Sequence, residues 1–224
     1  MKIIGLTDIH GKNINFGKIL MYKPDIIVVS GDITNFGRGR KIIDYLSYLN
    51  NNEGVYIITV YGNCDTENII SSLKERNFDI SYQFKNIFNL NFIGIGGSNP
   101  TPFNTPMEHS EEEIYSKFMN IYNKNKDTIG NNLIVVSHPP PKDTMADMLN
   151  NGQHVGSASV RKIIEEINPK LVFCGHIHES RCIDKINDSY IINPSPEAFV
   201  VVDIDDIDKH GNFKIYGIEI YDLR

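Results

Sequence analysis

IIGLTDIH, residues 3–10, is a short apolar run that leads directly into an acid and a histidine. Runs of the same kind recur at four later places: IIVVSGD at 26–32, IITVYGNCD at 57–65, LIVVSHPP at 133–140 and LVFCGHIH at 171–178. Because ligands of open α/β sheets bind outside the carboxyl ends of the strands, five such ends predict one shared site. The polar side chains gathered there would be Asp8, His10, Asp32, Asn63, His138, His176 and His178.

The first half of the chain alternates strand-like and helix-like patterns. In the second helical segment, apolar side chains recur at i, i+3, i+4 and i+7, at Ile42, Tyr45, Leu46 and Leu49. This spacing predicts one apolar stripe packed against a sheet. Alternation of this kind predicts βαβ crossovers and a largely parallel sheet. The expected strands lie at 2–6, 25–29 and 55–60, and the expected helices at about 14–21, 39–49 and 66–76.

The middle of the chain contains a predicted strand pair, at about 86–90 and 91–96, followed by a loop at 96–108 with three prolines. A loop of this length and composition is more often functional than a plain connector, so we expect a lid. A helix should begin at Ser110, where Glu113 completes a capping box. Another should begin near Ser157 and end before Pro169.

The tail after Arg181 changes to β-type patterns. Turn signals at Asn187-Asp188 and at 210–212 separate the runs, which predicts an antiparallel meander built as a second sheet. The fold class expected for the whole chain, residues 1–224, is a single α/β domain with two mixed sheets packed face to face and helices outside. The expected tail strands lie at 181–186, 189–192, 198–204 and 212–220.

Composition excludes several classes of function. A net charge of -6 argues against stable nucleic-acid binding, which depends on clustered Lys and Arg. No apolar run is long enough to span a membrane, and no signal peptide is recognisable, so we expect a cytoplasmic protein. The three cysteines are Cys64, Cys174 and Cys182, and an odd number without CxxC spacing favours reduced thiols.

The seven polar side chains have the chemistry of metal ligands. In Asp8-Ile9-His10 and His176-Ile177-His178, the i, i+2 spacing places both side chains on one side of an extended segment. Glycines precede Asp32, Asn63 and His176, and we expect each of them to allow a sharp turn at a strand end. A site built from oxygen and nitrogen donors favours Mn, Fe, Mg, Ni or Zn ions over softer metals.

The motifs DIH at 8–10, GD at 31–32, GNCD at 62–65, SH at 137–138 and GHIH at 175–178 resemble the calcineurin-like metallophosphoesterase superfamily. The resemblance implies a four-layer αββα fold and a centre of two divalent metal ions. It assigns Asp8, His10 and His178 to one ion. It assigns Asn63, His138 and His176 to the other, with Asp32 between them. HVGS at 154–157 and NPSP at 193–196 resemble small prokaryotic members related to cyclic-nucleotide phosphodiesterases.

This reading predicts a phosphoesterase that hydrolyses the P–O ester bond of a small organic phosphate, with a phosphodiester or a nucleotide favoured. Two divalent ions beside the carboxylates of Asp8 and Asp32 leave a net positive charge that attracts a phosphorylated substrate, although the protein is acidic. Metal binding lowers the pKa of water to about 7, which would supply a metal-bridging hydroxide as nucleophile. The expected cofactors are therefore two divalent metal ions.

One position departs from the superfamily pattern. Many members have a histidine after the motif asparagine, where it can protonate the leaving group, and this chain has Cys64 after Asn63. A thiol is a weak hydrogen-bond donor, so we expect slower hydrolysis of poor leaving groups. We hypothesise that His154, in a glycine-flanked loop, partly takes over this catalytic role. The alternative function is a non-catalytic scaffold or binding module that keeps the fold, and Cys64 is the residue that favours it.

Overall fold

Buried apolar runs form the strands of this α/β protein, and amphipathic segments form its helices. The computed structural model describes residues 1–130, 132–205, 207–208 and 212–224. The strands are β1 Lys2–Leu6, β2 Ile26–Ser30, β3 Tyr56–Val60, β4 Phe84–Ile87, β5 Leu90–Ile95, β6 Leu133–Ser137, β7 Leu171–Phe173, β8 Cys182–Ile186, β9 Ser189–Asn193, β10 Ala198–Asp205 and β11 Lys214–Asp222. The helices are α1 Phe16–Leu20, α2 Lys41–Asn52, α3 Glu67–Glu75, α4 Glu111–Ile129 and α5 Ala158–Ile167, with a short 3-10 turn at Met145–Asp147.

The strands form two mixed sheets. The five-stranded sheet has the order β11-β10-β1-β2-β3, in which β1, β2 and β3 are parallel and β10 and β11 are antiparallel. The six-stranded sheet has the order β4-β5-β6-β7-β9-β8, with parallel central strands and antiparallel edges. The predicted strand pair in the middle of the chain is confirmed as β4 and β5.

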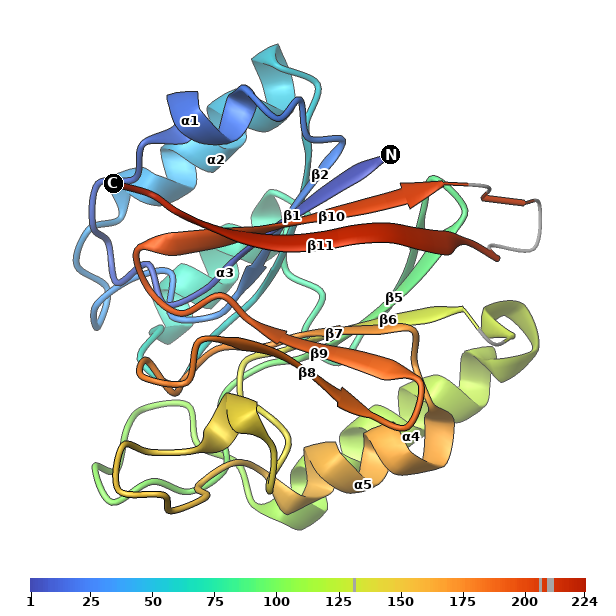
Figure 1. Ribbon diagram of the computed structural model, residues 1–224. Coiled ribbons are helices and arrows are strands. Elements are labelled where there is room, and N and C mark those ends of the chain that lie inside the picture. Colours follow the sequence, from blue (N-terminus) through green and yellow to red (C-terminus); the bar gives the residue numbers. More distant parts are fainter. Residues whose placement is uncertain (131, 206, 209–211) are drawn as a thin grey trace.

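Three layers of apolar side chains separate four layers of backbone. One cluster joins Leu6 and Val29 of the first sheet to Leu46 of α2. The second cluster lies between the sheets, and the third joins the other sheet to α4 and α5. Figure 1 shows the resulting order from top to bottom, with α1 and α2, the first sheet, the second sheet, and then α4 and α5. The expected αββα sandwich is confirmed.

The prediction for the tail was wrong in its pairing. Only β8 and β9 join the six-stranded sheet, whereas β10 and β11 extend the five-stranded sheet next to β1, as both views show. Strand β10 lies between two neighbours and is buried over its first five residues, 198–202. Such a continuous apolar run is typical of a strand covered on both faces rather than of one strand in a half-exposed meander. The predicted turn at 210 and 211 lies outside the described residues.

Local signals placed the later helices correctly. Ser110 and Glu113 form the reciprocal capping box of α4. Ser157 caps α5, which ends at the left-handed residue Asn168 just before Pro169. The three cysteines are free and buried. Within the described ranges, none of the helices is both long and apolar enough to cross a bilayer.

Candidate metal centre

The seven predicted ligands all follow the carboxyl ends of five strands, β1, β2, β3, β6 and β7. Pairing between the first two strands continues into their loops, because Asp8 N donates to Gly31 O at 3.1 Å and His10 N donates to Asp32 O at 2.8 Å. These loops hold Asp8, His10 and Asp32 at φ values of 51°, 49° and 48°, in the left-handed region. Strained backbone of this kind is common where a site must be preorganised.

Glycines let these loops approach one another closely. Gly31 has a φ of +89°, and a Cβ there would lie 2.4 Å from His138 Nδ1. A Cβ at Gly62 would lie 2.1 Å from Asp32 Oδ1, and one at Gly175 would lie 2.4 Å from Asp8 Oδ2. The prediction of a sharp turn therefore holds for Gly31 alone. At the other two positions, glycine is required because the carboxylate of a predicted ligand packs directly against the backbone.

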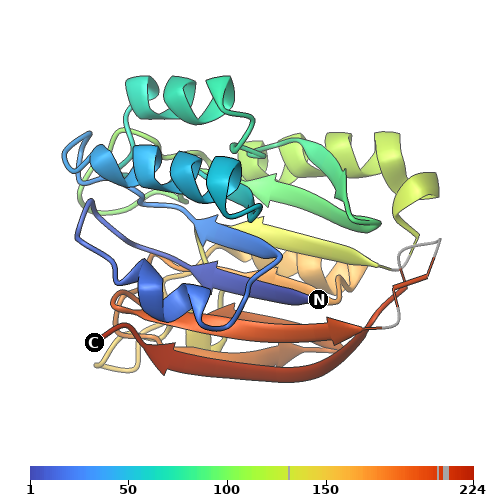
Figure 2. The same cartoon turned by 90° about the horizontal axis from the view of Figure 1, so that it is seen from above.

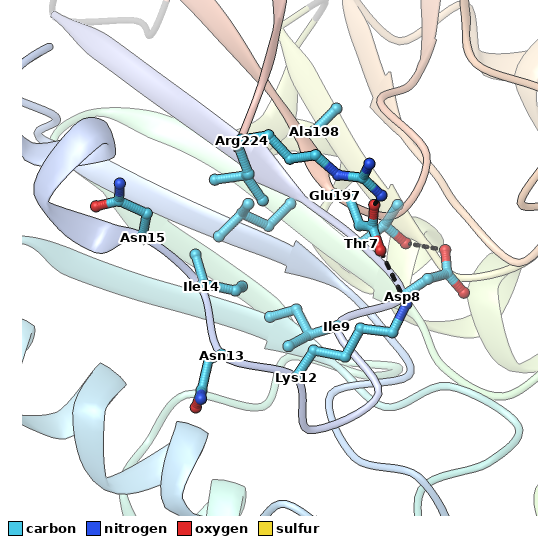
Figure 3. A pocket seen from close by; sticks show the side chains of 12 residues that line it. Thr7, Asp8, Ile9, Lys12, Asn13, Ile14, Asn15, Glu197, Ala198 and Arg224 are labelled. Carbon is cyan, nitrogen blue, oxygen red and sulfur yellow. Dashed lines mark hydrogen bonds and ion pairs between the residues drawn. The ribbon is translucent and has the colours of Figure 1, made fainter.

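Asp8 is buried and held from three directions. Its Oδ2 accepts hydrogen bonds from Thr7 Oγ1 at 2.6 Å, drawn in Figure 3, and from His176 N at 2.9 Å. Its Oδ1 lies 3.2 Å from His178 Nε2. Burial raises the pKa of the Asp8 carboxyl, but the hydrogen bond to His178 and the neighbouring His138 more than offset it and hold the pKa below its ordinary value. The carboxylate is therefore ionised and fixed in orientation.

Asp32 lies at the centre of the cluster. Its Oδ1 accepts a hydrogen bond from Cys64 N at 2.8 Å. Its Oδ2 lies 3.6 Å from His10 Nε2 and 3.6 Å from His138 Nε2. Burial and the nearby carboxylates of Asp8 and Asp65 raise the pKa of Asp32 to about 6, although His138 opposes the shift. This oxygen faces histidines on both sides, as a carboxylate shared between two cations would.

The cluster opens towards solvent on one side. The side chains of Asp8 and His138 are 1% and 0% exposed, whereas those of His10 and His178 are 18% and 50% exposed. The Nε2 atoms of His10 and His178 face each other at 3.2 Å. A substrate would therefore reach the cluster from the side of these two histidines.

A chain of hydrogen bonds fixes the orientation of Asn63. Thr105 Oγ1 donates to Glu108 Oε1 at 2.6 Å and accepts from Asn63 Nδ2 at 2.9 Å. The amide oxygen of Asn63 consequently faces His138, with Oδ1 2.8 Å from Nε2. A lid was predicted for this loop, but the contact of Thr105 with Asn63 was not. Proline content identified the loop, but spacing carried no signal for this contact.

The contact between Asn63 and His138 fits a metal ion. His138 Nδ1 lies 2.8 Å from the carbonyl oxygen of Ser30, which can only accept, so Nδ1 carries a proton. In a ring with this single proton, Nε2 is an acceptor, and it faces the Asn63 oxygen, which is also an acceptor. Two lone pairs at this distance require a second ring proton or a cation between them.

The structure brings the predicted ligands together in overlapping groups. Ligand atoms lie within 4.8 Å of one another in three sets: Asp8 with His10 and His178, Asp8 with Asp32 and His138, and His10 with Asp32 and Cys64. The ring of His176 lies 5.0 Å from that of His138, centroid to centroid. Burial, followed by the proximity of His138, lowers the pKa of His176 to about 3, so its ring is neutral.

Cys64 lies among the predicted ligands rather than merely beside them. Its sulfur is within 4.8 Å of the ligand atoms of His10 and Asp32. Burial and the charge of Asp32 raise the pKa of this thiol far above its ordinary value. In the absence of a cation, the sulfur is therefore a thiol and a weak hydrogen-bond donor.

His154 has a partner outside the cluster. Its Nδ1 lies 2.7 Å from Oδ1 of Asp147, which is completely buried. Its hydrogen bonds thus tie it to the segment at 143–156 and not to any of the seven ligands among the described residues. The catalytic role suggested for His154 stays a prediction.

The importance of Asp65 for the site was not predicted from the sequence, although Asp65 is the last residue of the GNCD motif. It is completely buried and accepts hydrogen bonds from Ile33 N, Thr34 N, Thr34 Oγ1 and Gly62 N, at 2.8 to 3.2 Å. It therefore locks the loop that carries Asp32 to the loop that carries Asn63. The motif contained the residue, but three of its four donors, in Ile33 and Thr34, lie 31 or 32 positions away.

Comparison with known proteins agrees with this geometry. Residues 1–180 match the profile of the calcineurin-like phosphoesterases. The uncharacterized protein MJ1162 of Methanocaldococcus jannaschii is 48% identical over 207 residues, which cover 91% of this chain and 92% of that protein. The chain therefore belongs to the calcineurin-like phosphoesterase family.

Solved structures share the fold at low sequence identity. TT1561 of Thermus thermophilus is 13% identical with a TM-score of 0.70, and the match covers 100% of this chain and 99% of that one. A dimetal phosphatase from Danio rerio is 10% identical with a TM-score of 0.63, covering 100% and 99%. The calcineurin-like phosphoesterase YfkN from Bacillus subtilis is 12% identical with a TM-score of 0.62, covering 100% and 90%.

Proposed function

We propose that this protein is a dinuclear metal-dependent phosphoesterase that hydrolyses the P–O ester bond of a small organic phosphate, with a phosphodiester or a nucleotide favoured. Family membership supports a metallophosphoesterase in general. The observation that carries the more specific proposal is that atoms of the predicted ligands face each other in pairs on both sides of Asp32. His138 faces Asn63 on one side and His10 faces His178 on the other, at 2.8 Å and 3.2 Å.

Each group would hold one divalent ion. Atoms that bind a common ion at about 2.1 Å lie about 3.0–3.4 Å apart. At the exposed position, His178 Nε2 lies 3.2 Å from both Asp8 Oδ1 and His10 Nε2, and the third spacing, from Asp8 Oδ1 to His10 Nε2, is 3.9 Å. Asn63, His138 and His176 would hold the ion at the buried position, with the Asp32 carboxylate shared. When bound, two such ions activate water and stabilise the oxygens of an in-line displacement at phosphorus. The oxygen and nitrogen donors suit Mn, Fe, Ni, Zn or Mg.

The protein's own residues contribute orientation. Thr7 and the backbone of His176 fix Asp8, the backbone of Cys64 fixes Asp32, and Thr105 fixes the amide of Asn63. No reorganisation is then needed when the phosphate arrives, which is the usual source of electrostatic catalysis. The exposed histidines, His10 and His178, face the direction of entry.

Proton donation to the leaving group is the weak point of the site. The Cys64 thiol replaces the imidazole common in the superfamily, and a missing general acid costs about 10²–10⁴-fold on poor leaving groups. His154→Ala tests the suggested substitute. An unchanged rate with a poor leaving group such as an alkyl phosphate would remove His154 from the catalytic residues.

The first experiment is metal-reconstituted hydrolysis of bis-p-nitrophenyl phosphate beside p-nitrophenyl phosphate. Wild type should be active, and Asp32→Ala and the nearly isosteric Asp32→Asn should both lose activity, because the shared ligand is gone. The ratio of the two rates distinguishes a diesterase from a monoesterase. Metal content, measured on the same samples, separates the alternatives. Two ions bound without turnover on any ester would favour the scaffold, and the absence of bound metal would refute the enzyme.

Metal binding should also stabilise the fold. Chelation leaves Asp8 and Asp32 buried close together without a counter-cation, whereas saturating metal at about 100 times its Kd adds about 2.7 kcal/mol. For a chain of this size, that corresponds to a Tm about 5–10 °C higher. Differential scanning calorimetry with chelator and with Mn²⁺ measures the shift. Asp32→Ala should abolish most of it, and an equal shift in that variant would contradict the assigned site.

We further propose that residues 1–224 form one domain in the cytoplasm. Support for one domain comes from the tail, whose strand β10 contributes to the clusters on both faces of the first sheet. The three free, buried cysteines fit a reducing compartment.

A further inference from the structure

A cavity of about 450 Å³ lies beside His176 and His178, the ligands on the side of the last motif. Its walls come from two segments far apart in the sequence, 99–103 and 149–155, which run close together at the lower left of Figure 1. A cavity of this size is within the range of small-molecule sites. Because it adjoins the proposed phosphate position, it is placed to receive the organic part of a substrate.

The wall of the cavity is largely apolar and is held in place. Phe103 is 82% exposed, and such a ring is available for stacking. The segment that carries it is fixed by Glu108, which accepts hydrogen bonds from the backbone and the hydroxyl of Thr101 at 3.1 Å and 2.6 Å. The apolar residues of the lining are Pro100, Pro102, Phe103, Leu149, Val155 and Ile177.

One polar group in the lining lacks a partner. Asn99 joins the two walls, because its Nδ2 donates to the carbonyl oxygen of Val155 at 3.3 Å. Its Oδ1 is buried and has no hydrogen-bond partner among the described residues. Buried acceptors are nearly always satisfied, so this atom calls for an N–H or O–H donor from a ligand or a water molecule.

The charges around the cavity disfavour a second anionic group. Its lining, as far as the described residues go, includes no lysine or arginine. Glu179 lies at the cavity and accepts hydrogen bonds from the backbone and the side chain of Asn150, which keep the carboxylate in place. A substrate with one phosphate at the metal ligands and an uncharged group in the cavity fits this arrangement. A substrate with a further phosphate there would be repelled.

We propose that this cavity binds a planar, uncharged, N–H-bearing ring of the substrate, such as a nucleobase, and that Phe103 and Asn99 determine this specificity. Phe103 offers its face for stacking, and Asn99 Oδ1 accepts a hydrogen bond from the ring. The inference rests on the proposed phosphoesterase function and adds the substrate class. On this inference, the preferred substrate does not have a small alkyl group as its organic part. Its organic part also does not carry a second phosphate.

The test compares two phosphodiesters that release the same leaving group, the p-nitrophenyl esters of thymidine 5′-phosphate and of methyl phosphate. Metal-loaded wild type should prefer the thymidine ester by about tenfold or more in kcat/KM, because stacking of one base on an aromatic ring is of that order. Phe103→Ala should remove about tenfold of this preference and leave the methyl ester within about twofold of wild type. Phe103→Tyr should restore the preference because it keeps the ring.

The matched control is Phe88→Ala, which removes another exposed phenylalanine, 52% exposed, from the turn between β4 and β5. It should change neither rate. Calorimetric titration with thymidine, which has no phosphate, provides a second readout, and Phe103→Ala and Asn99→Ala should both weaken its binding.

The outcomes separate the two proposals. Hydrolysis of both esters without preference, together with no effect of Phe103→Ala, overturns the cavity inference and leaves the phosphoesterase standing. Thymidine binding that depends on Phe103, with neither ester hydrolysed, supports the cavity and overturns the hydrolytic function. Failure of both hydrolysis and thymidine binding overturns both proposals.

Discussion

Two buried aspartates outside the predicted ligand set, Asp65 and Asp147, perform the same task in two different regions. Each is completely buried and accepts four hydrogen bonds. Asp65 connects loops that follow two different strands, whereas the partners of Asp147 lie within nine residues of it. The donors to Asp65 are all buried, but the side chain of His154, a donor to Asp147, is 32% exposed.

This difference indicates that the two aspartates have different purposes. Asp65 affects the geometry of the predicted ligands, and Asp147 affects the fit of the substrate. Asp65 spans the loops of Asp32 and Asn63 and thereby sets the distance between these two predicted ligands. Asp147 shapes the segment 143–156, which forms one wall of the cavity. Burial raises the pKa of Asp65 although four donors oppose the shift, so this carboxylate is kept at a cost in the interior. Four variants, described from the largest expected effect to the smallest, test whether the two regions are independent.

Asp65→Asn should have the largest effect. Asparagine supplies one acceptor oxygen, and its NH₂ group would face two buried N–H donors, so we expect a loss of about 4 kcal/mol in the free energy of unfolding. Metal binding should also be lost. Urea denaturation of the metal-free protein and metal titration measure the two effects. A stable variant that still binds two ions would show that Asp65 does not set the ligand spacing.

Gly62→Ala should come next. Its Cβ would lie 2.2 Å from the backbone nitrogen of Asp32, which cannot move aside as a flexible side chain would. Overpacking of this kind costs about 3 kcal/mol. Gly217→Ala is the matched control, because no atom lies within 4 Å of the added Cβ. Equal stability of the two variants in urea denaturation would contradict the close approach of these loops.

Asp147→Asn should be milder, with a loss of about 2 kcal/mol, because some of its donors can reach water instead. The preference for the thymidine ester should fall, but metal affinity and the rate on the methyl ester should stay within about twofold of wild type. Calorimetry and the two-ester assay check this. Loss of metal binding would mean that the two regions are coupled, which would break the comparison.

Thr105→Val should have the smallest effect on stability, about 1 kcal/mol, because the shape is conserved and only hydrogen bonds are lost. Without its hydroxyl partner, the Asn63 amide can rotate, so affinity for the ion at the buried position should fall about tenfold. Thr101→Val is the control, since Thr101 also donates to Glu108 but does not contact Asn63. Titration calorimetry should therefore find weakened metal binding only in Thr105→Val.

Much of the site was predictable because its residues can be recognised from the few residues next to them in the sequence. The seven predicted ligands follow apolar runs that form the strands, and a strand end next to a histidine or an acid is visible without any knowledge of neighbours. The starts of α4 and α5 were predictable for the same reason, since Ser110 and Ser157 accept hydrogen bonds from residues three positions later.

Other features had no local signal. The tail looked like one meander because β8, β9, β10 and β11 all have β-type composition, yet two strands joined each sheet. Antiparallel β10 could pair with any exposed edge, and the choice of β1 depends on how the two sheets pack. The role of Glu108 in orienting Asn63 also depends on a loop folding back onto another loop.

The sequence by itself determined the class of fold, the types of the predicted ligands and the order of the strand ends that carry them. It could do so because apolar runs, glycines and caps act over a few residues. Only the tertiary structure decided which atom of Asn63 faces His138, which backbone groups Asp65 holds, and that the segments at 99–103 and 149–155 enclose a cavity. These features rest on hydrogen bonds and contacts between residues tens of positions apart. Such partners are chosen by the packing of the whole sandwich and not by any short stretch of the chain.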